Sequence, residues 1–287
     1  MKNVLTTTLL IAATFMSANS VQAAPRCEHL FSESMALKPL PYDLYDHQYY
    51  DVRGKSEADV AAMNQKTLAD LMAYRPGHYN PKRSQSLTFK EANAIHQSIY
   101  ENKAAHPSKT VYYDKKNLGI GYCFGRSMYY HLMFLKKGLQ KESIKKIWAV
   151  GHMKTGNIDW GFHVATMVYT RDNNWMVIDS NHFEPISVEK WMDHYSQYNA
   201  EKDLRFYITT PEKFSVNTGK YARYQLGLDI NRDVDWFFHY FKDMMADEVQ
   251  FKTEYTKLVK LKPGSDDYKS SWRKFVDSFV QFVGLGK

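Results

Sequence analysis

The chain of 287 residues, with a mass of 33.6 kDa, is long enough for one large domain or two small ones. Hydrophobic residues make up 44% and charged residues 24%, a composition that excludes a disordered or collagen-like chain. The formal net charge is +7, but the basic residues are dispersed, which argues against a nucleic-acid-binding surface. The two cysteines exclude a disulfide-dense scaffold and a zinc site built on several thiolates.

Residues 1–23 have the three parts of a secretory signal peptide. Lys2 supplies the positive charge, Val4 to Met16 is apolar, and the small residue Ala23 marks the predicted cleavage site. We therefore expect a secreted or periplasmic protein. No later stretch approaches the ~20 apolar residues that span a bilayer, so no membrane insertion is expected after the signal is removed.

Residues 24–108 are predicted to form an N-terminal segment of helices and irregular chain. Apolar residues recur at helical spacing over 56–73, and a loop follows over 75–87. Thr88 and Glu91 form a capping-box pattern that predicts a helix running to about residue 103.

Residues 109–215 are predicted to form the core of the protein. An apolar helix should end at Gly138, and a turn over 170–174 should join two strands. The predicted elements are a helix over 122–137, strands over 144–151, 162–169 and 175–179, a helix over 186–195 and a strand over 204–209. This order of elements indicates an α+β fold.

Residues 216–287 are predicted to form a C-terminal helical segment that packs on the core. Two amphipathic helices are expected, over 232–261 and 266–283, and their aromatic faces are typical of core packing.

Cys123 stands where a loop becomes a helix, which suits a nucleophilic thiol. Unpaired backbone N–H groups and the positive end of the helix dipole favour thiolate over thiol, and Arg126 adds a cation one turn later. The same N–H groups can stabilise the oxyanion that forms when a thiolate attacks an amide.

His163 and Asp179 are placed to cooperate with such a thiol. His163 lies near the start of one predicted strand, and Asp179 ends the next. If Tyr169 pairs with Trp175 or with Asn173, alternation along the strands puts His163 and Asp179 on one face, directly or diagonally opposite. A carboxylate there can orient the imidazole, which can take the thiol proton and later protonate a leaving nitrogen.

Each of these residues also has a structural explanation. Cys123 can be one half of a disulfide with Cys27, since export would place both in an oxidising compartment. His163 can be a buried core histidine, and Asp179 can start a turn. Their coincidence in one layout favours catalysis. The histidines at 152, 182 and 194 are interpreted as structural or surface residues.

The local motifs resemble those of bacterial secreted protein-glutaminases, within the superfamily of papain-like and transglutaminase-core cysteine hydrolases. The resemblance covers roughly residues 110–210 and rests on short patterns around the three candidate residues. These are Tyr122-Cys123-x-x-Arg126, the strand end Val150-Gly151, Trp160 before an aromatic-His163-Val164-Ala165 sequence, and Ile178-Asp179 with Phe183, Pro185 and Trp191 downstream.

The resemblance implies a papain-like/transglutaminase-like core, in which a nucleophile-bearing helix packs on an antiparallel sheet. It further implies Cys123 as nucleophile, His163 as acid and base, and Asp179 as the group that orients His163. It also implies that residues 24–108 act like a pro-region. Tyr122, Trp160 and Phe162 are candidate substrate-binding residues. The expected activity is deamidation of glutamine side chains in proteins or peptides through a thioester, with no cofactor and no metal.

Two alternatives remain open at this stage. The same triad would serve a transglutaminase, a cysteine peptidase or a cell-wall amide hydrolase. A Cys27–Cys123 disulfide would instead indicate a secreted binding or effector module without enzymatic activity. The sequence carries no indication of an oligomeric state.

Overall fold

The computed structural model describes residues 51–102, 105–107, 123–213 and 216, together with the short stretches 260–262, 265–271 and 273–274. The signal peptide, Cys27, Tyr122 and nearly all of the predicted C-terminal helices lie outside the described residues, although 266–271 and 273–274 are helical. The helices are α2 (Glu57–Ala73), α3 (Phe89–Tyr100), α4 (Cys123–Lys136), the short 3-10 helix η2 (Lys141–Ser143) and α5 (Val188–Ser196). The strands are β1 (Ile144–Thr155), β2 (Ile158–Tyr169), β3 (Trp175–Ile178), β4 (Ile186–Ser187) and β5 (Arg205–Thr209).

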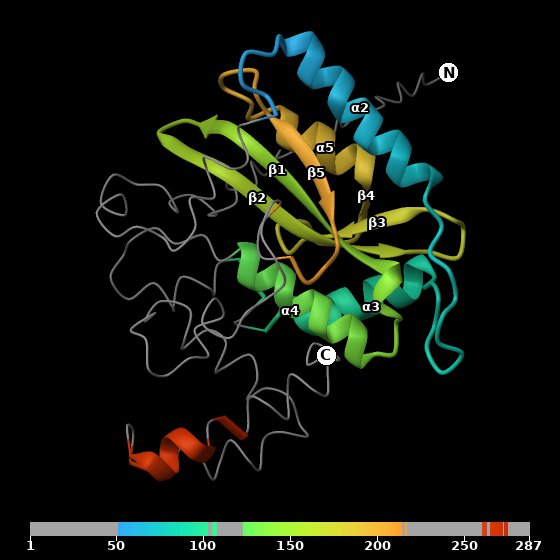
Figure 1. Ribbon diagram of the computed structural model, residues 1–287, viewed down its shortest axis with the longest axis vertical. Helices are drawn as coiled ribbons and strands as arrows, with labels where there is room; N and C mark the ends of the chain where they lie inside the picture. The colour runs from blue at the N-terminus through green and yellow to red at the C-terminus, as the bar shows by residue number, and fades with distance from the viewer. Residues whose placement is uncertain are drawn as a thin grey trace, which may run out of the picture.

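The strands form one antiparallel sheet in the order β4-β3-β2-β1-β5 (Figure 1). The turn between β1 and β2 starts with Gly156, whose φ of +56° suits a two-residue hairpin turn. The turn between β2 and β3 holds Asn173 at φ +62°, a conformation that asparagine tolerates better than most residues. This turn sets the register in which Tyr169 pairs with Trp175.

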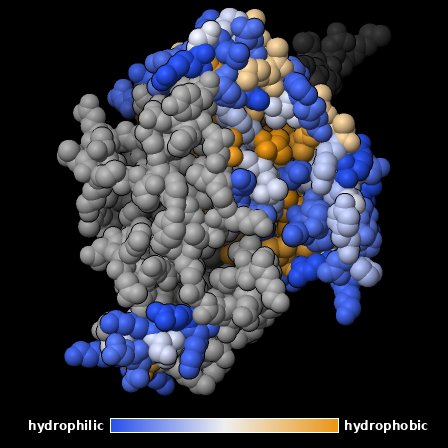
Figure 2. Space-filling model, in the orientation of Figure 1, coloured by the Kyte–Doolittle hydropathy of each residue, from blue (hydrophilic) through white to orange (hydrophobic). Residues whose placement is uncertain are grey.

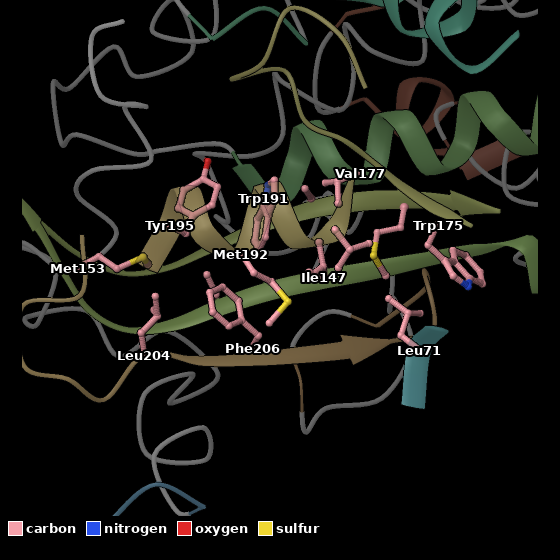
Figure 3. Packing of buried hydrophobic residues seen from close by; sticks show 14 of the residues in the cluster. Leu71, Ile147, Met153, Trp175, Val177, Trp191, Met192, Tyr195, Leu204 and Phe206 are labelled. Carbon is pink, nitrogen blue, oxygen red and sulfur yellow. The ribbon is translucent and has the colours of Figure 1, made fainter. Parts of the chain in front are cut away.

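Helices cover both faces of the sheet (Figure 1). On one face, inward side chains of β1, β2, β3 and β5 pack with α5 and with Leu71 of α2 into a buried apolar cluster. Figure 3 shows part of this cluster, with Trp191, Met192 and Tyr195 coming from α5. On the other face lies α4, where Ser127 bonds to Thr166 of β2. The helix-on-sheet arrangement confirms the predicted α+β class.

Local signals set the ends of the described helices. Ser56 caps α2 and Thr88 caps α3, each through a reciprocal capping box. The helix α4 ends before Gly138, whose φ of +91° suits a residue without a side chain.

A β-bulge interrupts the pairing of β1 with β2 between Val150 and Met153. Gly151 lies inside this bulge at φ +154°, and a Cβ there would come 2.8 Å from the Cα of Leu204. Glycine is therefore required at this position, close to the Ala149–His163 pair.

Most predicted elements are confirmed, with shifted ends. The helix predicted to about residue 103 ends at Tyr100, and the strands predicted over 144–151 and 162–169 extend to form a longer hairpin. The predicted helix over 186–195 was wrong in its first turn. Ile186 and Ser187 pair with β3 as the short strand β4, so the helix begins at Val188.

The described surface on the face in Figure 2 is mainly hydrophilic. Among the described residues the exposed large hydrophobic side chains are those of Tyr74, Tyr79, Phe89 and Phe183. A helix with the length and hydropathy of a membrane span is absent from the described part of the chain. The domain boundaries at 108 and 215 stay predictions. The helix α2 of the N-terminal segment packs against the sheet, since Leu71 belongs to the buried apolar cluster.

Candidate active site

His163 and Asp179 form a buried hydrogen-bonded pair. Thr166 pairs with Ile178, so Asp179 lies one residue beyond the last pair and His163 is its diagonal neighbour across the two strands. The Nε2 atom of His163 is 2.7 Å from Oδ2 of Asp179, and the two residues are 0% and 4% exposed. This is the geometry that the predicted hairpin register implies.

The carboxylate of Asp179 is bound on both oxygens. Trp191 donates its indole N–H to Oδ2 at 2.8 Å, and the hydroxyl of Tyr195 donates to the same oxygen at 3.2 Å. The backbone N–H of Asn181 donates to Oδ1 at 3.0 Å. A buried carboxylate needs such donors because they replace the hydrogen bonds that it would make with water.

These contacts keep Asp179 ionised. Burial by itself would raise the pKa of Asp179, but the charge of His163, the hydrogen bond from His163, the charge of His182 and the bond from Trp191 together hold that pKa below its ordinary value. A carboxylate can only accept, so the Nε2 of His163 carries a proton toward it. The Nδ1 of His163 is then the atom that can exchange a proton with a substrate or a thiol.

Cys123 is the first residue of α4 and is 1% exposed. Residues 126 and 127 share its face of the helix, one turn later. Ser127 bonds to Thr166 of β2, and Arg126 Nη2 lies 3.5 Å from Oδ1 of Asn181. The face of α4 that carries Cys123 is therefore turned toward β2 and toward the loop that follows Asp179.

Asn181 connects α4 to the histidine–aspartate pair. Its Nδ2 donates to the hydroxyl of Tyr195 at 3.1 Å and lies 3.4 Å from Nε2 of His163, while its Oδ1 faces Arg126. The strand β3 has ended at Ile178, so this contact runs around an edge of β2 that β3 leaves uncovered.

A buried lysine lies beneath the start of α4. Lys146 is 0% exposed; its Nζ donates to the carbonyl of Lys213 at 3.0 Å and lies 4.4 Å from the ring centroid of Phe124. Burial holds the pKa of Lys146 well below its ordinary value, while the charges of Glu212 and Cys123 act to raise it. Since such an interaction is mutual, a protonated Lys146 favours the thiolate of Cys123.

Two of the three predicted substrate-binding residues, Trp160 and Phe162, are buried. Trp160 is 2% exposed and packs against Tyr198, and Phe162 is 4% exposed and packs against Trp148. Tyr122 lies outside the described residues. A role for these residues in substrate binding stays a prediction.

Two of the remaining histidines lie close to Asp179. The rings of His182 and His194 are 4.9 Å apart, centroid to centroid. Burial lowers the pKa of each, whereas the charge of Asp179 acts to raise it. His96 of α3 bonds through Nε2 to the carbonyl of His182 and so anchors this loop.

His152, Glu201 and Asp203 are the one group of side chains in the described ranges with the spacing to hold a metal ion. Asp203 already binds the backbone N–H of His152 at 3.0 Å and its Nδ1 at 2.9 Å. These two bonds hold the β-bulge beside Gly151 in place, which gives the group a structural role.

Trp191 and Tyr195 were not predicted as site residues, although Trp191 belongs to the motifs of the resemblance. Their helical spacing of four residues was visible in the sequence and indicated only a core-facing stripe. That this stripe carries two polar hydrogens to Asp179 depends on how α5 packs, which no local pattern specifies.

The family comparison bears on this same region of the chain. Residues 90–195 match a family model described as glutaminase, and Cys123, His163 and Asp179 all fall within the match. No curated protein matches the chain.

Two solved structures are similar at a low level. One, a mutant of pro-protein-glutaminase, shares 16% identity at a TM-score of 0.35, covering 47% of this chain and 52% of that one. The other, pro-protein-glutaminase, shares 14% identity at a TM-score of 0.39, covering 63% and 66%. The chain thus spans about half to two thirds of the length of these proteins. The match of residues 90–195 confirms the resemblance seen in the motifs: this region of the chain is similar to the glutaminase family.

Proposed function

We propose that the protein is a thiol amidohydrolase that deamidates glutamine side chains in proteins, with Cys123 as nucleophile, His163 as acid and base, and Asp179 as the group that orients His163. The observation that carries the proposal is the buried 2.7 Å bond between His163 and Asp179, inside the region that is similar to the glutaminase family. The position of Cys123 at the start of α4 supports it.

The first half of the reaction transfers an acyl group. The thiol proton of Cys123 passes to Nδ1 of His163, and the sulfur attacks the carbon of the glutamine carboxamide. Backbone N–H groups at the start of α4 stabilise the oxyanion. His163 then protonates the nitrogen, which leaves as ammonia, and a thioester remains on Cys123.

The second half hydrolyses the thioester. His163 takes a proton from water, the resulting oxygen nucleophile attacks the thioester carbon, and the thiol of Cys123 is restored. The product is a glutamate side chain. Asp179 remains ionised throughout and stabilises the imidazolium of His163 in both halves.

The experiment is ammonia release from a glutamine-rich protein, combined with mass spectrometry of that protein. We expect a gain of ~1 Da for each converted side chain, with no cleavage and no cross-linking. Cys123→Ala should abolish the reaction and His163→Ala should be nearly as damaging, because residues that act as a unit fail together. Asp179→Ala should retain more activity, since the imidazole can still reach the thiol in some rotamers.

Two histidine variants serve as matched controls. His152→Ala and His194→Ala remove imidazoles from the same end of the sheet and should leave the reaction measurable. An active Cys123→Ala protein would exclude the thiol mechanism, and a dispensable His163 beside an indispensable His194 would exclude the proposed pairing.

The same measurement separates the other uses of the triad. Incorporation of an added amine would indicate a transglutaminase, and cleavage of the chain a peptidase. We further propose export of the protein, supported by the features of residues 1–23; a secreted form that begins at Ala24 is the expected result of N-terminal sequencing.

A further inference from the structure

Trp191 and Tyr195 each contact both members of the buried pair. They lie four residues apart on α5 and are both 0% exposed. Each donates a hydrogen bond to Oδ2 of Asp179, the same oxygen that faces His163. The ring of Tyr195 also stacks on the His163 ring at 4.5 Å between centroids and 20° between planes, and the Trp191 ring lies at 5.8 Å and 27°.

The hydroxyl hydrogen of Tyr195 is directed by its other contact. Asn181 donates Nδ2–H to this hydroxyl at 3.1 Å, so the hydroxyl accepts one bond and has its own hydrogen to give to Asp179. Since Asn181 also faces Arg126 of α4, the same chain of contacts reaches the helix that carries Cys123.

We propose that Trp191 and Tyr195 are positioning residues, which fix the plane of the His163 ring and set the basicity of the His163–Asp179 pair. Three donors share one oxygen of Asp179, so each takes part of the negative charge that would otherwise stabilise the imidazolium of His163. Removing a donor should therefore raise the pKa of His163. Only the turnover measurement depends on the proposed function; the titration of His163 does not.

Tyr195→Phe and Trp191→Phe remove one donor each and keep an aromatic ring in place. The other ionisable groups around Asp179 stay the same in both variants; they are His96 of α3, Arg126 and Tyr130 of α4, His182 of the loop after β3 and His194 of α5. Tyr198→Phe is the matched control, because its ring lies 6.2 Å from that of Tyr195 and its hydroxyl is not among the donors described at Asp179.

The test is an NMR titration of His163 in histidine-labelled protein, made in the Cys123→Ala background so that the thiol does not titrate with it. We expect the pKa of His163 to rise by about half a unit to one unit in Tyr195→Phe and in Trp191→Phe, and to stay unchanged in Tyr198→Phe. An unchanged pKa in the first two variants, or an equal rise in the control, would overturn the proposal.

Turnover gives a second, separate readout. With Cys123 restored, Tyr195→Phe should shift the pH profile of kcat by the same amount as the titration, with KM little changed. Because Tyr195→Phe removes only one oxygen atom, this variant decides the proposal by itself if Trp191→Phe does not fold. If the unmodified protein releases no ammonia, the proposed function fails while the titration still decides the role of these two residues.

Discussion

A buried carboxylate is stable only where hydrogen-bond donors replace its water, and Asp179 has four of them. They come from β2, from the loop after β3 and from α5, and no two are neighbours in the sequence. The residue therefore joins three elements, and its charge contributes to folding as well as to the proposed chemistry.

Asp179→Asn should destabilise the fold by about 2 kcal/mol at pH 7. The pKa of Asp179 is lower in the folded protein than its ordinary value near ~3.9, so its contribution is complete above that pH and is lost as the pH falls through the folded value. Urea unfolding of both proteins should show a difference that shrinks as the pH falls below ~4. A difference that widens below pH ~4 would contradict this.

Lys146→Met should make the protein more stable at pH 7, by about 1 to 2 kcal/mol, because a charge no longer has to be buried. The pKa of Lys146 is depressed by burial, so the cost of the charge is full below the folded value and disappears as the pH rises toward ~10.4. The advantage of the variant should therefore decrease between neutral pH and pH ~10, as thermal unfolding can measure.

The same substitution should slow the reaction. A protonated Lys146 favours the thiolate of Cys123, so ammonia release should fall in the variant even though the protein is more stable. A variant that is both less stable at pH 7 and fully active would show that Lys146 is a structural residue alone.

Contacts between individual side chains could be predicted from the sequence where they follow from the alternation of side chains between the two faces of a strand. His163 and Asp179 were placed together because strand side chains have a period of two, and both registers considered for the turn over 170–174 put them on one face; the structure has the register in which Tyr169 pairs with Trp175. The contacts of Trp191, Tyr195 and Asn181 with this pair could not be predicted. They depend on how α5 and a loop pack against the sheet, which no local pattern specifies.

At the scale of elements, local signals predicted the ends of helices better than the extent of strands. The capping box at Thr88 and the glycine at 138 act within one turn, so they are readable in the sequence. The outer part of the first hairpin contains His152, Lys154 and Asn157, which do not resemble a strand. Pairing across the hairpin overrides that local preference.

The bulge in β1 yields a prediction about this hairpin. Gly151→Ala should destabilise the protein by more than ~2 kcal/mol, because the new Cβ would lie 2.8 Å from the Cα of Leu204 and 2.9 Å from Oδ1 of Asp203. Since Ala149 pairs with His163 two residues away, activity should fall as well. Chemical unfolding and ammonia release measure the two effects.

Gly156→Ala is the control in the same hairpin. Gly156 also has a positive φ, +56°, but a Cβ there meets nothing within 4 Å. It should cost only about 1 kcal/mol, the strain of the backbone alone. Equal losses for the two variants would mean that the contact with residues 203 and 204 does not matter.

At the scale of the whole molecule, the candidate site draws on both faces of the sheet. The helix α4 brings Cys123 from one face, and α5 holds the histidine–aspartate pair from the other. They are connected at the edge of β2 beyond the end of β3, through Asn181 and Arg126. A short β3 is thus a condition for the site, since a longer strand would cover this edge.

Whether Cys27 and Cys123 are linked decides whether the proposed enzyme would be active as made. Cys27 lies outside the described residues, so a bond to Cys123 stays a prediction to be tested. A thiol at a helix start is prone to disulfide exchange, and such a bond would be reducible and regulatory. We expect instead that the mature protein shows two titratable thiols without reductant. One of them should be alkylated much faster near neutral pH. The reason is that a structural disulfide would not explain why a thiol at a helix start is matched with a histidine and an aspartate.

A non-reducing peptide map distinguishes the remaining outcomes. A linkage of Cys27 to Cys123, with activity that appears on adding reductant, would mean that the bond holds the enzyme latent. The same linkage with no gain of activity would leave a binding module held by a permanent disulfide. Cys27→Ser is the matched variant: it should be active without reductant whether or not the bond forms in the native protein, because Cys123 then has no second cysteine in its own chain.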